Sequence, residues 1–197
     1  MSIAISKFIL AAKRAAWPAF RRGWWLSVLL ALSVPGISLS ARADQAAISE
    51  YSLKAVLFFK LPQFVYWPDT VSTRNNLIFC VLGNNPFGKA LELLAREPID
   101  GRQVEIVNLA AVGDGIVCDF IFISRSENAS VEGIIRKFAG KRVVTVSDIP
   151  GFAKAGGMVE LTVSGERVGV TLNRKAAQKQ GLEFNAQLLR LAKVVEP

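Results

Sequence analysis

The 197-residue sequence contains no histidine. This absence excludes Ser-His-Asp and Cys-His catalysis, because both use an imidazole as the general base. It also excludes the usual zinc sites, which rely on imidazole ligands, and two cysteines are too few for a site made of cysteine alone. The acidic residues are scattered singly, without a D-x-D or E-x-x-E cluster. The sequence therefore predicts no catalytic residue, no metal site and no cofactor.

The first 43 residues lack acidic side chains and carry six basic ones. They contain an 11-residue apolar run, Trp24–Val34, which is shorter than the roughly 20 residues that a membrane-spanning helix needs. A Pro-Gly pair follows, and then Ala41 and Ala43 have the small-x-small spacing of a cleavage site. This layout is typical of a secretory signal. We predict a signal peptide over residues 1–43 and an exported domain over residues 44–197, with an uncleaved anchor as the alternative.

Removal of residues 1–43 changes the charge of the protein. The whole chain has a formal net charge of +8, but the predicted exported domain has 18 basic and 16 acidic residues, a net charge of +2. A nucleic-acid-binding domain would need a basic stripe on its folded surface. We therefore expect no nucleic-acid partner.

The two cysteines, Cys80 and Cys118, favour one disulfide, because paired cysteines persist in exported chains. The alternative is two buried thiols that behave as small hydrophobic groups. Both cysteines lie in strand-like runs, "LIFCVLG" and "IVCDFIFIS", and a bond between two strands of one sheet is geometrically demanding.

Strand-like and helical patterns alternate along the exported domain. Apolar residues at helical spacing predict a helix within residues 48–66, which Pro62 kinks or ends. Strands are predicted in "NLIFCVLG", "GRQVEIVNL", "VCDFIFIS" and "KRVVTVSD", and helices in "NPFGKALELLAREP" and "NASVEGIIRKFAG". This order predicts an α/β three-layer sandwich, a mainly parallel sheet flanked by helices.

The pattern changes after residue 157. Two alternating runs in "MVELTVSGERVGVTLN" predict a β-hairpin around residues 164–166. A short helix that Gly181 closes should follow, and then a final amphipathic helix. The apolar face of that last helix is predicted to contain Leu188, Leu189, Leu191, Ala192 and Val195.

The stretch "DIPGFAKAGGMVEL" resembles a phosphate-binding loop only in its glycines. A Walker loop needs Lys-Ser/Thr after its last glycine, but Met158 follows Gly157 here. A dinucleotide loop needs a following helix, and a hairpin is predicted instead. We therefore expect Gly151, Gly156 and Gly157 to permit a tight turn, with positive φ angles.

Three aromatic residues each have two interpretations. Phe152 either fills the core or, together with Val170 and the turn glycines Gly156 and Gly157, forms a surface that binds a partner. Tyr66 and Trp67 either fix a helix end to the core or line a pocket for a small ligand. A carboxylate enzyme using Asp119 or Asp148 at a strand end is a weaker alternative, because no paired base or nucleophile accompanies either residue.

The chain also resembles the YfiR-like periplasmic proteins over nearly all of the exported domain. That family opens with a segment of the type "KAAFLYNFAKFVEWP", and this chain has "LKAVLFFKLPQFVYWP". The pieces "CVLGNNPFGKALELL", "CDFIFIS", "VVTVSDIPGFAKAGGMVEL" and "NRKAAQKQGLEFNAQLLRLAKVV" follow in the family's order. Each piece is weak by itself, but five of them in the correct order are specific.

The resemblance implies a non-catalytic periplasmic regulator. Such a protein represses an inner-membrane diguanylate cyclase through its periplasmic part, and its release raises cyclic-di-GMP and favours biofilm. The resemblance also implies a homodimer and an outer-membrane lipoprotein that can sequester the regulator. Some relatives carry a second cysteine pair around "VSDIPGFA", where this chain has residues such as Val146 and Ala153. Only the Cys80–Cys118 pair remains here, so the resemblance does not extend to the redox tuning of those relatives.

Overall fold

The computed structural model describes residues 50–67, 75–113, 115, 117–164 and 167–196. All of them belong to one unit, Leu39–Pro197. The predicted signal peptide and its cleavage site lie outside the described residues, as do residues 165 and 166 of the predicted hairpin turn. Within the described ranges, no helix has the length and apolar character needed to cross a membrane.

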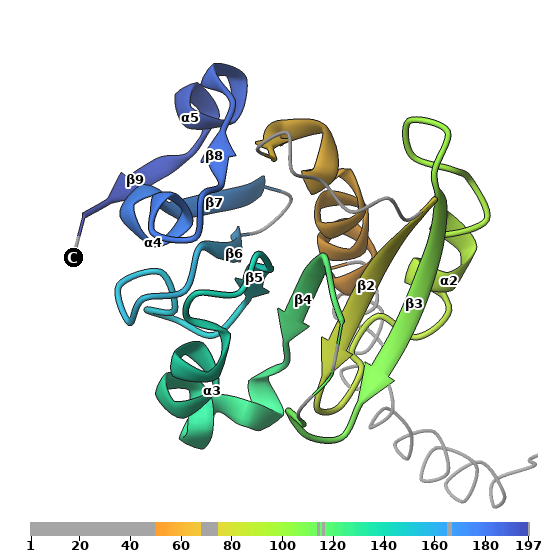
Figure 1. The fold of residues 1–197 in the computed structure, drawn as a ribbon, viewed down its shortest axis with the longest axis horizontal. Helices are drawn as coiled ribbons and strands as arrows, with labels where there is room; N and C mark the ends of the chain where they lie inside the picture. The colour runs from red at the N-terminus through yellow and green to blue at the C-terminus, as the bar shows by residue number, and fades with distance from the viewer. Residues whose placement is uncertain (1–49, 68–74, 114, 116, 165–166, 197) are drawn as a thin grey trace, which may run out of the picture. The chain divides into compact units, whose positions relative to one another are not determined.

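A seven-stranded sheet forms the middle layer of this unit (Figure 1). Its strand order is β3-β2-β4-β5-β6-β7-β9, and all neighbouring strands are parallel except the antiparallel pair β6–β7. The strands are β2 (Asn76–Leu82), β3 (Gln103–Leu109), β4 (Phe120–Ile123), β5 (Val144–Ser147), β6 (Val159–Ser164), β7 (Arg167–Asn173) and β9 (Lys193–Val195). The predicted parallel sheet and the predicted hairpin are both confirmed.

Helices lie on both faces of the sheet, which confirms the predicted α/β sandwich. The helix over residues 50–60 and α2 (Ala90–Leu94) pack on one face, whereas α3 (Val131–Phe138) packs on the other. The remaining helical segments are η1 (Leu61–Phe64), η2 (Arg125–Ser130), α4 (Arg174–Gln178) and α5 (Ala186–Leu191). A separate two-stranded sheet pairs β1 (Val65–Tyr66) with β8 (Glu183–Phe184).

Strand β2 is apolar from Leu77 to Leu82, and the two cores that it borders explain why. Successive side chains of a strand point to opposite faces of a sheet. Leu77, Phe79 and Val81 enter a large core beneath the helix over residues 50–60, which we name the aromatic core. Cys80 and Leu82 enter a smaller core beneath α3, which we name the second core. A strand covered on both faces therefore needs apolar side chains throughout.

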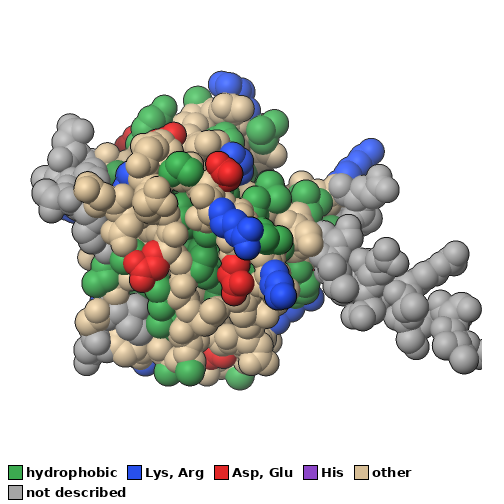
Figure 2. Space-filling model, turned by 90° about the vertical axis from the view of Figure 1, so that its right-hand side faces the viewer, with side chains coloured by type: hydrophobic (Ala, Val, Ile, Leu, Met, Phe, Trp, Pro, Cys, Tyr) green, Lys and Arg blue, Asp and Glu red, His purple; other side chains and the backbone are tan. Residues whose placement is uncertain are grey.

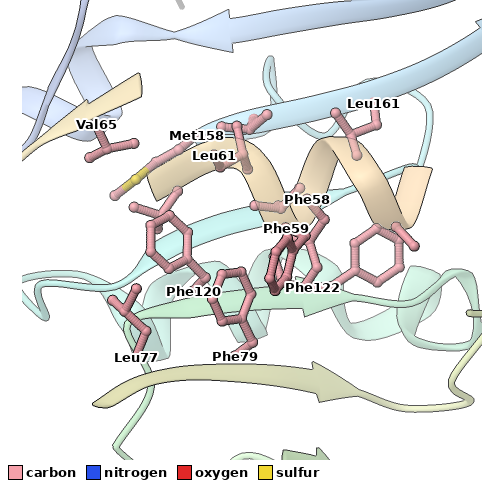
Figure 3. Close-up of a cluster of buried hydrophobic side chains, with 14 of the residues drawn as sticks. Phe58, Phe59, Leu61, Val65, Leu77, Phe79, Phe120, Phe122, Met158 and Leu161 are labelled. Atoms are coloured by element: carbon pink, nitrogen blue, oxygen red, sulfur yellow. The ribbon is translucent and has the colours of Figure 1, made fainter. Parts of the chain in front are cut away.

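Phenylalanine rings from the first helix and the central strands build the aromatic core (Figure 3). Phe79 of β2 stacks on Phe120 of β4 with ring centroids 5.0 Å apart. Phe58 of the first helix meets Phe79 edge-on at 5.1 Å. The first helix ends at residue 60, and Pro62 lies in η1, as expected of a helix-ending proline. These contacts fix the first helix over β2 and β4.

Two predicted helices differ from the structure. The helix expected within residues 85–98 is only α2, because Gly88 has φ +53° and a left-handed residue cannot lie inside a right-handed helix. The final helix ends at Leu191, and Lys193–Val195 pair in parallel with β7 instead. Leu188, Leu189 and Ala192 pack against the aromatic core, whereas Leu191 is 76% exposed and Val195 lies in β9, so the predicted apolar face is wrong for these last two.

Candidate functional site

The glycine-rich stretch is the crossover that links β5 to β6, residues 148–158. Parallel neighbours usually need a helix in such a connection, but here the crossover contains only turns. Gly151 and Gly156 have φ angles of +82° and +106°, as predicted. Gly157 does not have a positive φ, so that part of the prediction is wrong. It is glycine because a Cβ there would lie 2.1 Å from the Phe152 ring.

In the absence of a helix in the crossover, the Phe152 side chain covers this end of the sheet, on the face where α3 packs. Its side chain is 1% exposed and belongs to the second core. The interpretation of Phe152 as a core residue is therefore confirmed, and the exposed contact is wrong for this ring. Gly157 beneath it is also buried, whereas Gly156 is half-buried.

Val170 of β7 lies on the other side of the sheet from Phe152. It is half-buried and packs against the aromatic core, whereas Phe152 packs in the second core. The two residues predicted to form one partner surface are therefore not brought together. Only Val170 keeps part of its side chain accessible to a partner on that face.

The carboxylate of Glu160 in β6 accepts hydrogen bonds from two backbone amides of the crossover. The backbone N–H of Gly151 donates to its Oε1 and that of Ala153 donates to its Oε2, each at 3.1 Å. These are the kind of turn amides that bind phosphates in nucleotide loops. Because the protein's own carboxylate already holds them, the expectation that this stretch is a structural turn is supported. Sequence reasoning missed this role, although an acidic residue in the apolar run "MVELTV" is the signal that could have revealed it.

Tyr66 and Trp67 line a small pocket of about 250 Å³, together with Leu182 and Glu183 near β8. Tyr66 is 64% exposed. Trp67 is half-buried, and its ring meets Phe120 edge-on with centroids 5.6 Å apart. One part of Trp67 therefore packs on the core while another borders the pocket, and Tyr66 lies mostly outside the core.

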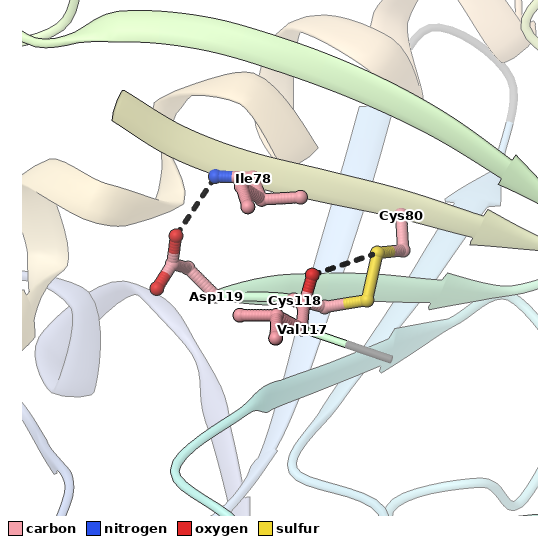
Figure 4. Close-up of a disulfide and its surroundings, with 5 residues drawn as sticks. All are labelled: Ile78, Cys80, Val117, Cys118 and Asp119. Atoms are coloured by element: carbon pink, nitrogen blue, oxygen red, sulfur yellow. Dashed lines mark hydrogen bonds between the residues drawn. A yellow bond between two sulfur atoms is a disulfide. The ribbon is translucent and has the colours of Figure 1, made fainter. Parts of the chain in front are cut away.

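Cys80 and Cys118 form a disulfide with Cα atoms 5.9 Å apart, as predicted (Figure 4). The geometric difficulty of bridging two strands does not arise, because Cys118 lies before β4, which begins at Phe120. The dashed line between Cys80 Sγ and the Val117 carbonyl oxygen marks a 4.0 Å contact. A bonded sulfur has no hydrogen to donate, so we read that contact as packing.

Asp119 forms hydrogen bonds to the neighbouring strand. Its backbone N–H donates to the Ile78 carbonyl at 2.8 Å. Its Oδ2 accepts from the Ile78 N–H, also at 2.8 Å, and Figure 4 marks this second bond. The side chain thus continues the ladder between β2 and the approach to β4. This structural role accounts for a buried carboxylate at this position.

A buried lysine is the feature that sequence reasoning missed. Lys54 of the first helix is 0% exposed, and its Nζ donates to Asp148 Oδ2 at 2.7 Å. Arg125 Nε also lies 3.1 Å from that oxygen, and Glu50 pairs with Lys54 one turn away. Asp148 therefore ties the first helix to the end of β5. Turns, and no helix, follow Asp148 in the crossover.

Tyr51 borders the same ion pairs, and Lys54 Nζ lies 4.6 Å from the centre of its ring. Burial raises the pKa of the Tyr51 hydroxyl, and the negative charge of Asp148 raises it further. The cluster thus joins two basic side chains, two carboxylates and a phenol. Its groups neutralise one another, and nothing in this arrangement orients a nucleophile toward a reacting atom.

The face of the molecule in Figure 2 shows no continuous area of basic side chains. That view looks onto the side of the molecule that bears β3, and basic and acidic side chains are mixed there with hydrophobic ones. Nucleic-acid binding would need a continuous basic area. Among the residues that the structure describes, no group of three or more His, Cys, Asp or Glu side chains is arranged to hold a metal ion.

Comparison with known protein families gives a match to the YfiR/HmsC-like family over residues 51–193. The matched range begins in the first helix and ends in β9, so it contains the sheet, the disulfide and the crossover. It also contains Lys54 and Asp148. The chain therefore belongs to the YfiR/HmsC-like family.

Proposed function

We propose that this protein is a non-catalytic periplasmic regulator that binds and represses an inner-membrane diguanylate cyclase through the periplasmic part of that enzyme. The YfiR-like family is known for periplasmic regulators of diguanylate cyclases. The observation that carries the proposal is the extent of the match, because residues 51–193 span nearly all of the described unit. A regulator of this kind needs export, and the basic, then apolar, then small-residue leader over residues 1–43 supports it.

The partner surface that we favour lies on the face of the first helix. Leu53 and Val56 of that helix are exposed although Lys54 between them is buried. Val170 is half-buried on the same side of the sheet. Exposed apolar side chains that gather in one patch mark interaction sites, and we propose that Leu53, Val56 and Val170 belong to such a patch. The buried Phe152 and Gly157 would support the fold, and Gly156 stays a possible contact at the crossover.

A pull-down from membranes tests the proposal. The purified exported protein should capture an inner-membrane protein that has a periplasmic part and a diguanylate cyclase part. Val56→Asp combined with Val170→Asp should release it. Leu93→Asp on α2, which replaces another exposed hydrophobic residue, is the matched control and should retain capture. Circular dichroism confirms that each variant is folded. Capture that survives both substitutions would contradict the surface, and no captured cyclase under oxidising or reducing conditions would contradict the function.

The assembly state belongs to the same proposal. We infer a homodimer, and sequestration by an outer-membrane lipoprotein as the route of release, from what the family resemblance implies. Light scattering on the purified protein tests the first inference, and a monomer at micromolar concentration would contradict it. Capture of an outer-membrane lipoprotein in the same pull-down tests the second.

A small-ligand sensor is the second candidate function, favoured by the pocket beside Tyr66 and Trp67. Its volume of about 250 Å³ lies just below the roughly 300 Å³ at which ligand sites usually begin, so the pocket would take only a small aromatic or heterocyclic metabolite that stacks on the exposed Tyr66 ring. Such a ligand should raise the unfolding temperature and change Trp67 fluorescence. Tyr66→Ala should abolish both effects. Unchanged unfolding temperatures across a panel of such metabolites would remove this candidate and leave the first one untouched.

A further inference from the structure

The two edges of the seven-stranded sheet differ in how well they are protected. Strand β3 lies at one edge and β9 at the other (Figure 1). Proteins guard such edges with short strands, lysines, prolines or bulges, because an open edge pairs readily with another chain. Strand β9 has 3 residues, and its Lys193 is exposed. Strand β3 has 7 residues without lysine or proline, and it pairs with β2 in one unbroken register. It is therefore the unprotected edge.

Half of the backbone groups of β3 point away from the sheet. The Gln103 N–H donates to the Asn75 carbonyl at 3.3 Å, and the Leu109 carbonyl accepts from the Gly83 N–H at 2.9 Å. Because backbone groups alternate in direction along a strand, every second residue from Gln103 to Leu109 bonds to β2. The residues between them direct their N–H and C=O groups outward: Val104, Ile106 and Asn108. Among the described strands, none pairs with that side of β3.

The side chains of β3 suit an added strand. Its half-buried apolar side chains border the two cores: Val104, Ile106, Val107 and Leu109. Glu105 is the one charged residue of the strand, and its Oε2 accepts a hydrogen bond from Asn76 Nδ2 at 3.0 Å. Figure 2 looks onto this side of the molecule, where hydrophobic side chains are visible between charged ones. A strand placed here would extend both apolar layers of the sheet.

We propose that β3 pairs with β3 of a second copy of this chain, antiparallel, about a two-fold axis beside Ile106. In this register Ile106 lies opposite its own counterpart, and Val104 lies opposite Asn108 of the other copy. Each outward N–H of one strand then faces an outward C=O of the other. Glu105 lies opposite Val107, so no like charges stand directly opposite each other, which would be destabilising. The edge is thus complementary to itself.

The difference between the two edges favours a closed dimer. A two-fold pairing uses β3 of both copies and leaves only the short β9 strands at the ends of the joined sheet. Those ends carry the exposed Lys193, so further copies should not add. The interface rests on the homodimer inferred above as part of the proposed function, and it names the surface that forms that homodimer.

Amide hydrogen exchange on the purified exported protein tests the interface, with nuclear magnetic resonance as the readout for each residue. In a monomer, the outward amides of Val104, Ile106 and Asn108 meet solvent and should exchange faster than the inward amides of Glu105 and Val107. In the proposed dimer, the outward and inward amides should all exchange slowly. Light scattering on the same sample gives the number of copies.

Asn108→Pro removes one outward N–H, and proline is tolerated where an edge N–H faces away from the sheet. It should raise the dissociation constant of the dimer about tenfold or more, since each copy loses a hydrogen bond and leaves a carbonyl of the other without its donor. Analytical ultracentrifugation measures this change. The Val104 and Ile106 amides should then exchange fast in the dissociated protein.

Asn108→Ala is the matched control. Both substitutions remove the side-chain hydrogen bond from Asn85 Nδ2 to Asn108 Oδ1, but alanine keeps the backbone N–H. The alanine variant should therefore remain as dimeric as the unchanged protein. Circular dichroism establishes that each variant is folded. If the proline variant does not fold, the exchange pattern of the unchanged protein decides by itself.

The outcomes separate this interface from the proposed function. A dimer whose outward amides exchange fast would overturn the interface and leave the homodimer in place, whereas a monomer would overturn both. Slow outward exchange in a monomeric protein would mean that the chain covers its own edge, and it too would overturn the interface, as would equal dissociation of both Asn108 variants. Capture of the cyclase is measured separately in the pull-down.

Discussion

At the scale of single residues, the contact between Gly157 and Phe152 is the tightest constraint in the crossover. Gly157→Ala would place a methyl group 2.1 Å from the Phe152 ring, inside the second core. Overpacking of this kind costs about 1–3 kcal/mol, so we expect the free energy of unfolding in urea to fall by that amount. Combining it with Phe152→Leu should recover part of the loss.

Gly133→Ala is the matched control for this prediction. Gly133 lies inside α3, and an added Cβ would find its nearest neighbour, Arg136 Nη2, at 3.9 Å. Alanine in a helix interior is more favourable than glycine by up to about 1 kcal/mol. The two substitutions should therefore change stability in opposite directions. Equal effects would contradict the assigned role of Gly157.

The buried Lys54 predicts a second effect of a single residue. Lys54→Met removes the cation that faces the buried Asp148 carboxylate and leaves only the half-exposed Arg125 beside it. Breaking a buried pair by removing one partner costs about 3–5 kcal/mol, and Arg125 should keep the loss near the lower end. Lys60→Met, at an exposed position of the same helix, should change stability by less than about 0.5 kcal/mol. A loss below about 1 kcal/mol for Lys54→Met would show that the pair is dispensable.

Because of Tyr51, the free energy of unfolding should depend on pH in the alkaline range. Its pKa is raised above 10.0 in the folded protein by burial and by Asp148. The unfolded chain therefore releases the phenol proton at lower pH than the folded chain does. The contribution of Tyr51 to the free energy of unfolding is fully present below about pH 10, and it is lost as the pH rises through the pKa of Tyr51 in the folded protein. Tyr51→Phe should flatten the decline of unfolding free energy in this range, and identical slopes would contradict the prediction.

At the scale of elements, the disulfide closes a loop from the middle of β2 to the start of β4. The two cysteines are 38 residues apart in sequence. In the chain-entropy model such a loop stabilises by about 4 kcal/mol. Replacing both cysteines by alanine should lower the free energy of unfolding by up to that amount, measured in urea. Dithiothreitol should lower the stability of the unchanged protein and leave the alanine variant as it was.

The elements themselves differ in how far the sequence predicts them. The central strands are predictable because strands covered on both faces need continuous apolar runs, as in "NLIFCVLG". The C-terminal segment is not, because Val194 and Val195 fit a helical spacing as well as a strand. The open edge of β7 decides between them, and that edge exists only in the folded molecule. A local sequence pattern carries no information about such a tertiary contact.

The residues of the candidate sites also differ in how far the sequence predicts them. The disulfide could be predicted from cysteine number and export alone. Lys54 could not be placed in the core, because its partner Asp148 lies 94 residues away in the sequence. Phe152 and Val170 looked alike as apolar residues near turns, but they pack on opposite faces of the sheet. Side-chain direction after an irregular crossover follows from the fold and not from spacing.

At the scale of the whole molecule, export is the prediction that matters first. The protein recovered from the periplasm should begin at Asp44, which N-terminal mass spectrometry can establish. Ala43→Arg should block cleavage, because the processing site requires small residues. The uncleaved chain should then remain with the membrane. A soluble protein that still begins at Met1 would contradict both export by this leader and the regulatory proposal.

The disulfide also has a consequence for how the sheet can be assembled. Cys80 faces the second core, and a slip of one residue in β2 would turn it to the opposite face. The bond between Cys80 and Cys118 fits the native register, in which Phe79 lies beside Phe120. Oxidation should therefore favour the correct alignment of the central strands. In chains whose β2 has slipped by one residue we expect the two thiols to stay free, and this chemical mark would distinguish them from correctly assembled chains.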